Sequence, residues 1–223
     1  MGKDKTEKTS ASDHIAFFLQ KYRKVILALV IIIAFGIAFS VGYFMIHGMI
    51  EKKAIAKVEV LEQRLNELGL SNETAHSAEA DTLLEEINVF ASSAFGYAAA
   101  RSYSLAADIY FTRSEWKKAE ESWVISAQKA PKIYLYPLSL FNAAVATEEQ
   151  GRLEAAIDYY RQSLDYGGIY PAAARARFNI GRIFEEQNER SKALDAYREL
   201  IEKNPGSPWA NLAHNRLIIL EKN

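Results

Sequence analysis

The sequence predicts an all-α protein, with an N-terminal transmembrane helix followed by a right-handed solenoid of helical hairpins and a C-terminal capping helix. Three observations predict this fold class. One apolar segment near the N-terminus is long enough to span a membrane, a pattern of small and aromatic residues recurs every 37 residues, and the chain ends in an amphipathic segment.

The apolar segment is Val25–Ile46, a run of 22 residues without a charged side chain. As a helix it would be about 33 Å long, and the hydrocarbon core of a bilayer is about 30 Å thick. A cleaved signal peptide has a shorter apolar region that ends at small residues, whereas here the nearest Ala-x-Ala follows three charged residues. We therefore expect a retained transmembrane helix over residues 25–46, with the lipid bilayer as a partner.

Charges beside this segment predict its orientation. Residues 1–24, a predicted basic tail, carry six Lys or Arg and three Asp or Glu. The positive-inside rule places such a tail in the cytoplasm. The sequence thus predicts a single-pass protein of the inner (plasma) membrane with a periplasmic C-terminal domain. Lysines also follow the span, at Lys52 and Lys53, so the reversed topology with a cytosol-facing domain is the alternative.

The composition argues against several classes of function. The 223 residues include no cysteine, and the four histidines have no metal-binding spacing. The sequence shows no glycine-rich phosphate loop and no pairing of a nucleophile with a base. A net charge of −1 gives no electrostatic basis for binding nucleic acid. We expect no enzymatic activity, no metal and no cofactor.

Residues 47–94 are expected to form membrane-proximal helices that make a degenerate repeat. Val58, Leu61, Leu65 and Leu68 form one apolar stripe at helical spacing. We expect this stripe to pack against the next helix of the same chain. A short coiled-coil seam between subunits is the alternative.

Residues 95–205 repeat themselves with a period of 37. Each of three copies contains a small residue, a turn former, an alanine, an aromatic residue and a breaker, in the order Ala107, Ser114, Ala119, Trp123, Pro131; Ala144, Gly151, Ala156, Tyr160, Gly168; Gly181, Asn188, Ala193, Tyr197, Pro205. Two antiparallel helices approach closely only where their side chains are small, and the aromatic ring then fills the gap to the next hairpin. Stacked hairpins share the core that a single hairpin cannot form.

This pattern resembles the tetratricopeptide repeat, whose signature is W-x2-L-G-x2-Y, then A-x3-F, then P. The first copy reads Tyr103-x2-Ala106-Ala107-x2-Tyr110, and Thr147 and Arg177 depart from the signature in the later copies. The resemblance implies repeats at about 100–133, 137–170 and 174–206 within residues 95–223, followed by a capping helix over 207–222. It also implies a concave face that binds proteins or peptides.

Repeat geometry projects ten residues onto that concave face: Arg101, Asp108, Phe111, Phe141, Asn142, Val145, Arg175, Phe178, Asn179 and Arg182. Phe141 and Phe178, each followed by an asparagine, suit an extended peptide or a helix. The alternative is that an aromatic residue followed by Asn is an ordinary part of the repeat. Both rings should face away from the small-residue contacts, so we expect their truncation to remove binding area rather than core.

The layout of a basic tail, one span and about three repeats is similar to the bacterial inner-membrane family that includes the ancillary subunit of the Sec translocon. This resemblance implies a helper of protein export whose partners are translocon subunits, periplasmic chaperones or exported chains. One alternative is an envelope-assembly or cell-division scaffold that oligomerises through Gly36 and Ser40 in the span and the 58–68 stripe. Another, if the topology is reversed, is an anchored cytosolic receptor.

Overall fold

The computed structural model describes residues 11–167 and 170–222, and every regular element in these ranges is helical. The chain divides into two compact units, Met1–Lys52 and Lys53–Asn223. The helices are α1 (Ala11–Leu68), α2 (Ala78–Ser93), α3 (Gly96–Thr112), α4 (Trp116–Lys129), α5 (Leu135–Glu148), α6 (Leu153–Leu164), α7 (Ala173–Glu186), α8 (Arg190–Lys203) and α9 (Pro208–Lys222), with a 3-10 turn η1 (Thr74–His76) before α2. The predicted all-α fold class is confirmed.

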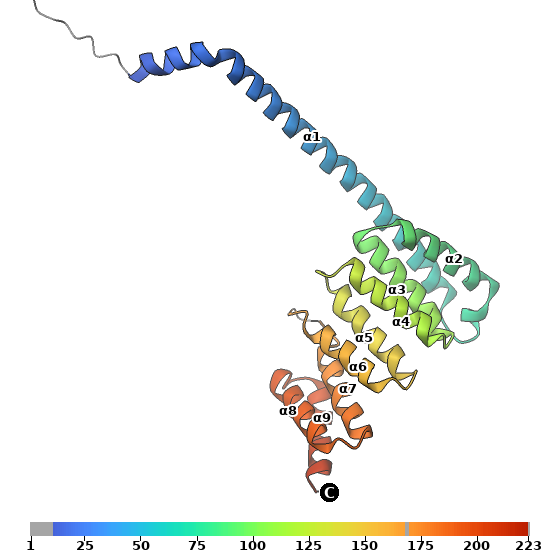
Figure 1. The fold of residues 1–223 in the computed structure, drawn as a ribbon. Helices are drawn as coiled ribbons and strands as arrows, with labels where there is room; N and C mark the ends of the chain where they lie inside the picture. The colour runs from blue at the N-terminus through green and yellow to red at the C-terminus, as the bar shows by residue number, and fades with distance from the viewer. Residues whose placement is uncertain (1–10, 168–169, 223) are drawn as a thin grey trace, which may run out of the picture. The chain divides into compact units, whose positions relative to one another are not determined.

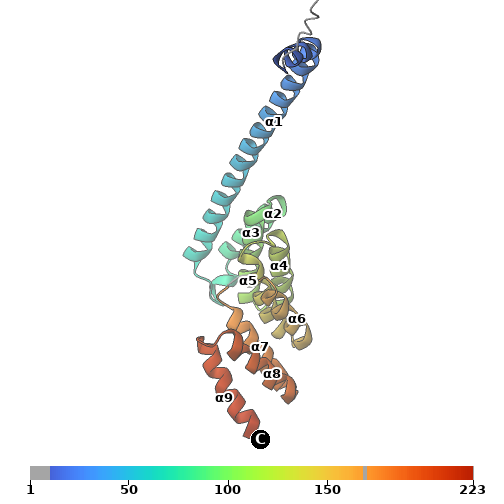
Figure 2. The same cartoon turned by 90° about the vertical axis from the view of Figure 1, so that its left-hand side faces the viewer.

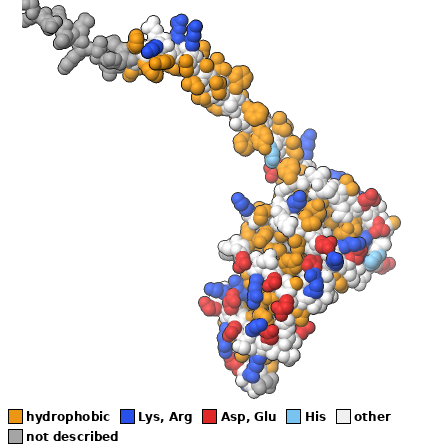
Figure 3. Space-filling model, viewed as in Figure 1, with side chains coloured by type: hydrophobic (Ala, Val, Ile, Leu, Met, Phe, Trp, Pro, Cys, Tyr) orange, Lys and Arg blue, Asp and Glu red, His pale blue; other side chains and the backbone are white. Residues whose placement is uncertain are grey.

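The first unit contains the N-terminal part of α1. Its large apolar side chains between Ile15 and Ile50 are exposed, and they cover this helix in the space-filling view (Figure 3). Among the described residues, α1 is the one helix long and apolar enough to cross a membrane, with a mean hydropathy of 2.9. Residues 1–10 of the predicted basic tail lie outside the described residues.

The second unit is a stack of helical hairpins in chain order (Figures 1 and 2). Helices α3 and α4, α5 and α6, and α7 and α8 pair as hairpins, and α9 packs against α8 and α7. The C-terminal part of α1 and α2 precede them. Val58, Leu61 and Leu65 are buried there in one cluster with residues of α2 and α3. The apolar stripe is therefore used inside its own chain and is not available as a coiled-coil seam.

The three hairpin turns share one backbone conformation. Ser114, Gly151 and Asn188 have φ angles of 60°, 71° and 60°, which lie in the left-handed region. In each turn the next backbone N–H donates to a carbonyl five residues earlier, and the pairs are Glu115 to Tyr110, Arg152 to Thr147, and Glu189 to Phe184. The 37-residue period therefore predicted the turn positions correctly. Gly168, the predicted breaker of the second copy, lies outside the described residues.

Small residues set the distance between the helices of each hairpin. Ala119, Ala156 and Ala193 are fully buried. At Gly181, a Cβ atom would lie 2.6 Å from Cε1 of Tyr197, so the tyrosine ring occupies the space that any side chain would need. The third hairpin is thus closed around the pair Gly181 and Tyr197.

Helix α9 differs from the first helices of the three hairpins at the position of their small residue. Ile218 stands 37 residues after Gly181, where the hairpins have glycine or alanine, and its side chain is 53% exposed. A branched side chain at this position prevents another helix from packing as closely as α8 packs on α7. Helix α9 therefore serves as a cap.

Candidate functional site

The first helix of each hairpin supplies the predicted concave face, and α9 continues it. Helices α3, α5 and α7 carry the ten predicted residues. Side chains from consecutive helices meet on this face. Arg175 of α7, for example, has its guanidinium carbon 5.3 Å from the centroid of the Phe141 ring in α5. These helices therefore place predicted residues close to one another, but the roles of those residues differ along the face.

At the N-terminal end, Arg101 pairs with the membrane-proximal part of α1, and Phe111 packs within its own hairpin. The guanidinium of Arg101 donates to both carboxylate oxygens of Glu62 in α1, at 3.1 and 2.5 Å. These bonds lower the pKa of Glu62. Burial raises the pKa of Asp108 to about 6, although nearby Arg101 opposes the rise. Phe111 packs against two tryptophans of α4. This part of the face is engaged within the chain.

Asn179 joins the second and third hairpins. Its side-chain amide donates a hydrogen bond of 2.8 Å to the hydroxyl of Tyr160, and that hydroxyl donates to Glu148. Arg182 also forms an ion pair with Glu148. Burial and the neighbouring Glu148 carboxylate raise the pKa of Tyr160. Asn179 and Arg182 therefore contribute to contacts between repeats. Asn142, which stands one period before Asn179, is half-buried.

The two predicted phenylalanines have different environments. Phe141 is 4% exposed and its ring centroid lies 5.4 Å from that of Tyr160. The expectation that this ring lies outside the core is wrong, because Tyr160 and Arg175 cover it. Phe178 is half-buried and contacts the rings of Tyr197 and Trp209. Of the two rings, Phe178 is the one that reaches the surface. A role for either ring in binding a protein stays a prediction.

Arg175 is the most open of the predicted basic residues. Its guanidinium carbon lies 5.3 Å from the centroid of the Phe141 ring and 5.7 Å from that of the Trp209 ring. Within residues 11–167 and 170–222 its side chain has no hydrogen bond and no ion pair. The rings fix the position of the cation and leave its N–H donors available.

Helix α9 adds residues to this face that the sequence argument missed. Leu212 and Ile219 are 46% and 45% exposed, and Trp209 is half-buried beside Phe178. Leu212 follows Arg175, and Ile219 follows Arg182, by one 37-residue period. Extending the period into the capping helix would have predicted both residues.

Comparison with known proteins identifies the family. A family model described as tetratricopeptide repeat matches residues 104–169 and 141–208, two stretches that start one 37-residue period apart. A "TPR repeat-containing protein" of Treponema pallidum (strain Nichols) is 31% identical over 219 residues, which is 91% of both chains. The chain belongs to the tetratricopeptide repeat (TPR) family. As a TPR protein it is a protein–protein interaction module.

Two further similarities cover less of the chain. "Uncharacterized protein ycf37" of Cyanophora paradoxa is 28% identical over 123 residues, which is 54% of this TPR protein and 67% of the relative. The solved structure of BtubC (BKLC) from P. vanneervenii is 19% identical with a TM-score of 0.46, and the match covers 72% of this chain and 65% of that one.

A cavity of about 450 Å³ is lined by residues of α7, α8 and α9. The residues that line it are Phe178, Arg182, Glu185, Glu186, Tyr197 and Arg216. Arg216 donates to Glu185, and these bonds lower the pKa of that carboxyl group. Two predicted residues, Phe178 and Arg182, therefore lie at a cavity, next to the exposed part of α9.

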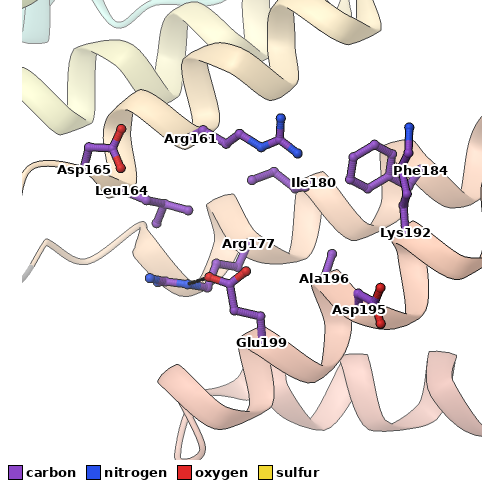
Figure 4. Close-up of a pocket in the computed structure, with 10 residues that line it drawn as sticks. All are labelled: Arg161, Leu164, Asp165, Arg177, Ile180, Phe184, Lys192, Asp195, Ala196 and Glu199. Carbon is purple, nitrogen blue, oxygen red and sulfur yellow. Dashed lines mark hydrogen bonds and ion pairs between the residues drawn. The ribbon is translucent and has the colours of Figure 1, made fainter.

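A second cavity, of about 520 Å³, lies among α6, α7 and α8 (Figure 4). Its apolar residues include Ile180 and Phe184, and an ion pair between Arg177 and Glu199 crosses it. It is also lined by three basic and three acidic side chains, so it favours neither sign of charge. None of the ten predicted residues lines this cavity.

Proposed function

We propose that this TPR protein is held in a membrane by α1 and binds an extended segment of another protein across α5, α7 and α9. The observation that carries this proposal is the exposure of Leu212 and Ile219 on a capping helix. Both residues lie one period after residues of α7 on the same face, beside the half-buried ring of Trp209. Exposed apolar side chains beside half-buried aromatic rings are characteristic of an interaction surface.

The anchor is supported by the length and apolar surface of α1. Its exposed apolar side chains require a nonaqueous environment, and the residues are numerous enough to cross a bilayer. The excess of basic residues in the tail favours a cytoplasmic N-terminus and a periplasmic repeat domain in the inner membrane. Protease added to right-side-out spheroplasts should then remove the repeat domain. Protection of the domain until the membrane is broken would reverse the topology.

Within this class, we favour a helper of the protein-export machinery that hands over exported chains. The support is the similarity of its layout to the family that includes the ancillary Sec translocon subunit. An oligomeric scaffold has less support, because the 58–68 stripe is buried inside the chain. In the span, the Ser40 hydroxyl donates to the Gly36 carbonyl at 2.9 Å, so this hydroxyl is already hydrogen-bonded within its own helix.

Photocrosslinking in native membranes tests the proposal. A photoreactive residue at Leu212 or Ile219 should crosslink to translocon subunits, periplasmic chaperones or exported chains, identified by mass spectrometry. The same residue at Glu202, an exposed position on α8, is the control. Crosslinks to those partners from Glu202 alone would contradict binding at the concave face. Crosslinks from Gly36 to a second copy, with none from α9, would favour the scaffold.

A further inference from the structure

Among the residues that the structure describes, the predicted arginines of the concave face differ in whether a carboxylate pairs with them. Arg101 pairs with Glu62, Arg182 with Glu148 and Glu186, and Arg216 with Glu185. Arg175 has no such carboxylate among the described residues. A guanidinium recognises a carboxylate through two parallel hydrogen bonds, and stacking on rings keeps it oriented for this purpose.

Apolar side chains flank Arg175 in the same register. Leu138 on α5 precedes it by one period of 37 residues, and Leu212 on α9 follows it by one period. The second row repeats the order, because Val145 and Ile219 flank Arg182 in the same way. Along the direction that crosses the three helices, the face is therefore apolar, basic and apolar. Because Glu148 and Glu186 pair with Arg182, Arg175 is the arginine of these two rows that has no carboxylate partner in the described ranges.

The distance between these helices predicts which residues of a bound segment lie over each helix. Side chains of α5 and α7 meet at Phe141 and Arg175, and those of α7 and α9 meet at Phe178 and Trp209. Helices whose side chains meet lie about 10 Å apart, and an extended chain advances about 3.3 Å per residue. A segment that crosses α5, α7 and α9 thus moves about three residues from one helix to the next. An acidic side chain over Arg175 places residues three positions before and after it near Leu138 and Leu212.

We propose that the concave face selects extended protein segments in which an internal Asp or Glu has a bulky apolar residue about three positions to either side. This inference rests on the proposed function and adds the chemistry of the partner. A polyanion is a poorer match, since Glu185 and Glu186 line the adjoining cavity. A segment with the same apolar residues and no acid leaves the Arg175 donors without an acceptor.

Selection from a phage-displayed library of random 12-residue peptides tests the proposal, with the full chain held in nanodiscs. Wild-type protein should enrich peptides with an internal acid and apolar residues at that spacing. An enriched peptide with an amidated C-terminus should lose at least tenfold in affinity when its acid is replaced by the amide. Arg175→Gln should cause a similar loss for the acidic peptide and little change for the amide peptide.

Arg161→Gln is the matched control. Arg161 also lies over a phenylalanine ring, at 5.9 Å, and has no ion pair in the described part of the chain, but it lines the cavity among α6, α7 and α8. It should leave peptide affinity unchanged. Arg175→Glu should reverse the preference toward peptides with Lys at the central position. Circular dichroism on each variant confirms that the fold is retained.

Three other results would overturn the inference, and they separate its failure from that of the proposed function. If the enriched peptides lack the acid, or bind Arg175→Gln equally well, while Leu212→Asp abolishes binding, the face binds apolar segments and the acidic preference is wrong. If no peptide is enriched, or if Leu212→Asp and Ile219→Asp have no effect, binding at the concave face is wrong as well. Loss of binding on amidation of the C-terminus alone would assign the carboxylate to a chain end.

Discussion

The side-chain amide of Asn179 donates a hydrogen bond to the hydroxyl of Tyr160 and thereby joins α7 to α6. One period later, Arg216 of α9 occupies the position of Asn179. It donates at 3.1 Å to Glu185, which also accepts a bond of 3.0 Å from the Tyr197 hydroxyl. The two junctions thus use the same positions with different side chains. A polar bond beside a buried ring fixes how each unit sits on the next.

Removing the amide of Asn179 should weaken the second junction. We expect Asn179→Ala to destabilise the protein by about 1–2 kcal/mol, because the Tyr160 hydroxyl loses a buried donor. Thermal unfolding followed by circular dichroism, with the full chain in detergent micelles, measures the change. Asn211→Ala on the exposed side of α9 is the control. Equal unfolding temperatures for the two variants would mean that the Asn179 amide does not contribute to stability.

Phe141 should behave as a core residue. We expect Phe141→Ala to cost about 3–5 kcal/mol, the usual range for truncating a buried phenylalanine, because the ring packs on Tyr160 and is covered by Arg175. Phe178→Ala should cost clearly less, since that ring is only half-buried. Urea unfolding of both variants gives the comparison. Similar costs would mean that the two rings are equally important for the core.

A methyl group at Gly181 should be poorly tolerated. Helix propensity favours alanine over glycine by about 1 kcal/mol, but overpacking against a rigid ring costs about 1–3 kcal/mol. With Cε1 of Tyr197 at 2.6 Å from the new atom, we expect Gly181→Ala to be destabilising overall. Gly206→Ala, which meets nothing within 4 Å, is the control in the same unfolding assay. A stabilised Gly181→Ala variant would show that the two helices of the hairpin can move apart without a loss of stability.

Asp108 should make stability depend on pH. Its pKa is 3.8 as the ordinary value and about 6 in the fold. Below pH 4 the carboxyl group is protonated in both states. Between pH 4 and 6 the unfolded chain releases the proton more readily, so this contribution to stability is lost as the pH rises. Asp108→Asn should match wild type near pH 4 and be more stable by about 1–3 kcal/mol at pH 7. Urea unfolding at both values checks this, with the exposed Asp158→Asn as control.

The pattern of small residues and turns predicted most of the fold because the local backbone conformation and helix packing allow only a few residue types at those positions. A left-handed φ at residue 151 favours glycine, and a helix contact at residue 156 excludes large side chains. Such constraints recur in each copy and are visible in a single sequence. The ion pair between Glu62 and Arg101 joins residues 39 positions apart and obeys no period. The sequence therefore did not show this ion pair, although it predicted that the membrane-proximal helices form a degenerate repeat before the stack.

The candidate site was harder to predict, because burial depends on what the next helix presents. Phe141 and Phe178 occupy equivalent positions, yet Phe141 is covered by Arg175, whereas the residue one period after Arg175 is Leu212. Equivalent positions therefore differ in exposure. Asn179 donates a hydrogen bond to the hydroxyl of Tyr160. One period earlier, at Asn142, the corresponding aromatic residue is Trp123, which has no hydroxyl group.

Ile218 also bears on how such an array can lengthen in evolution. Tandem duplication copies a hairpin together with its register, so a fourth unit would bring a new second helix against the face of α9 that carries this side chain. The first three units accept that helix through alanine or glycine at the equivalent position. A duplicated hairpin added after α9 would meet the isoleucine and remain loosely docked. Growth of the array in that direction therefore requires a substitution at residue 218 first.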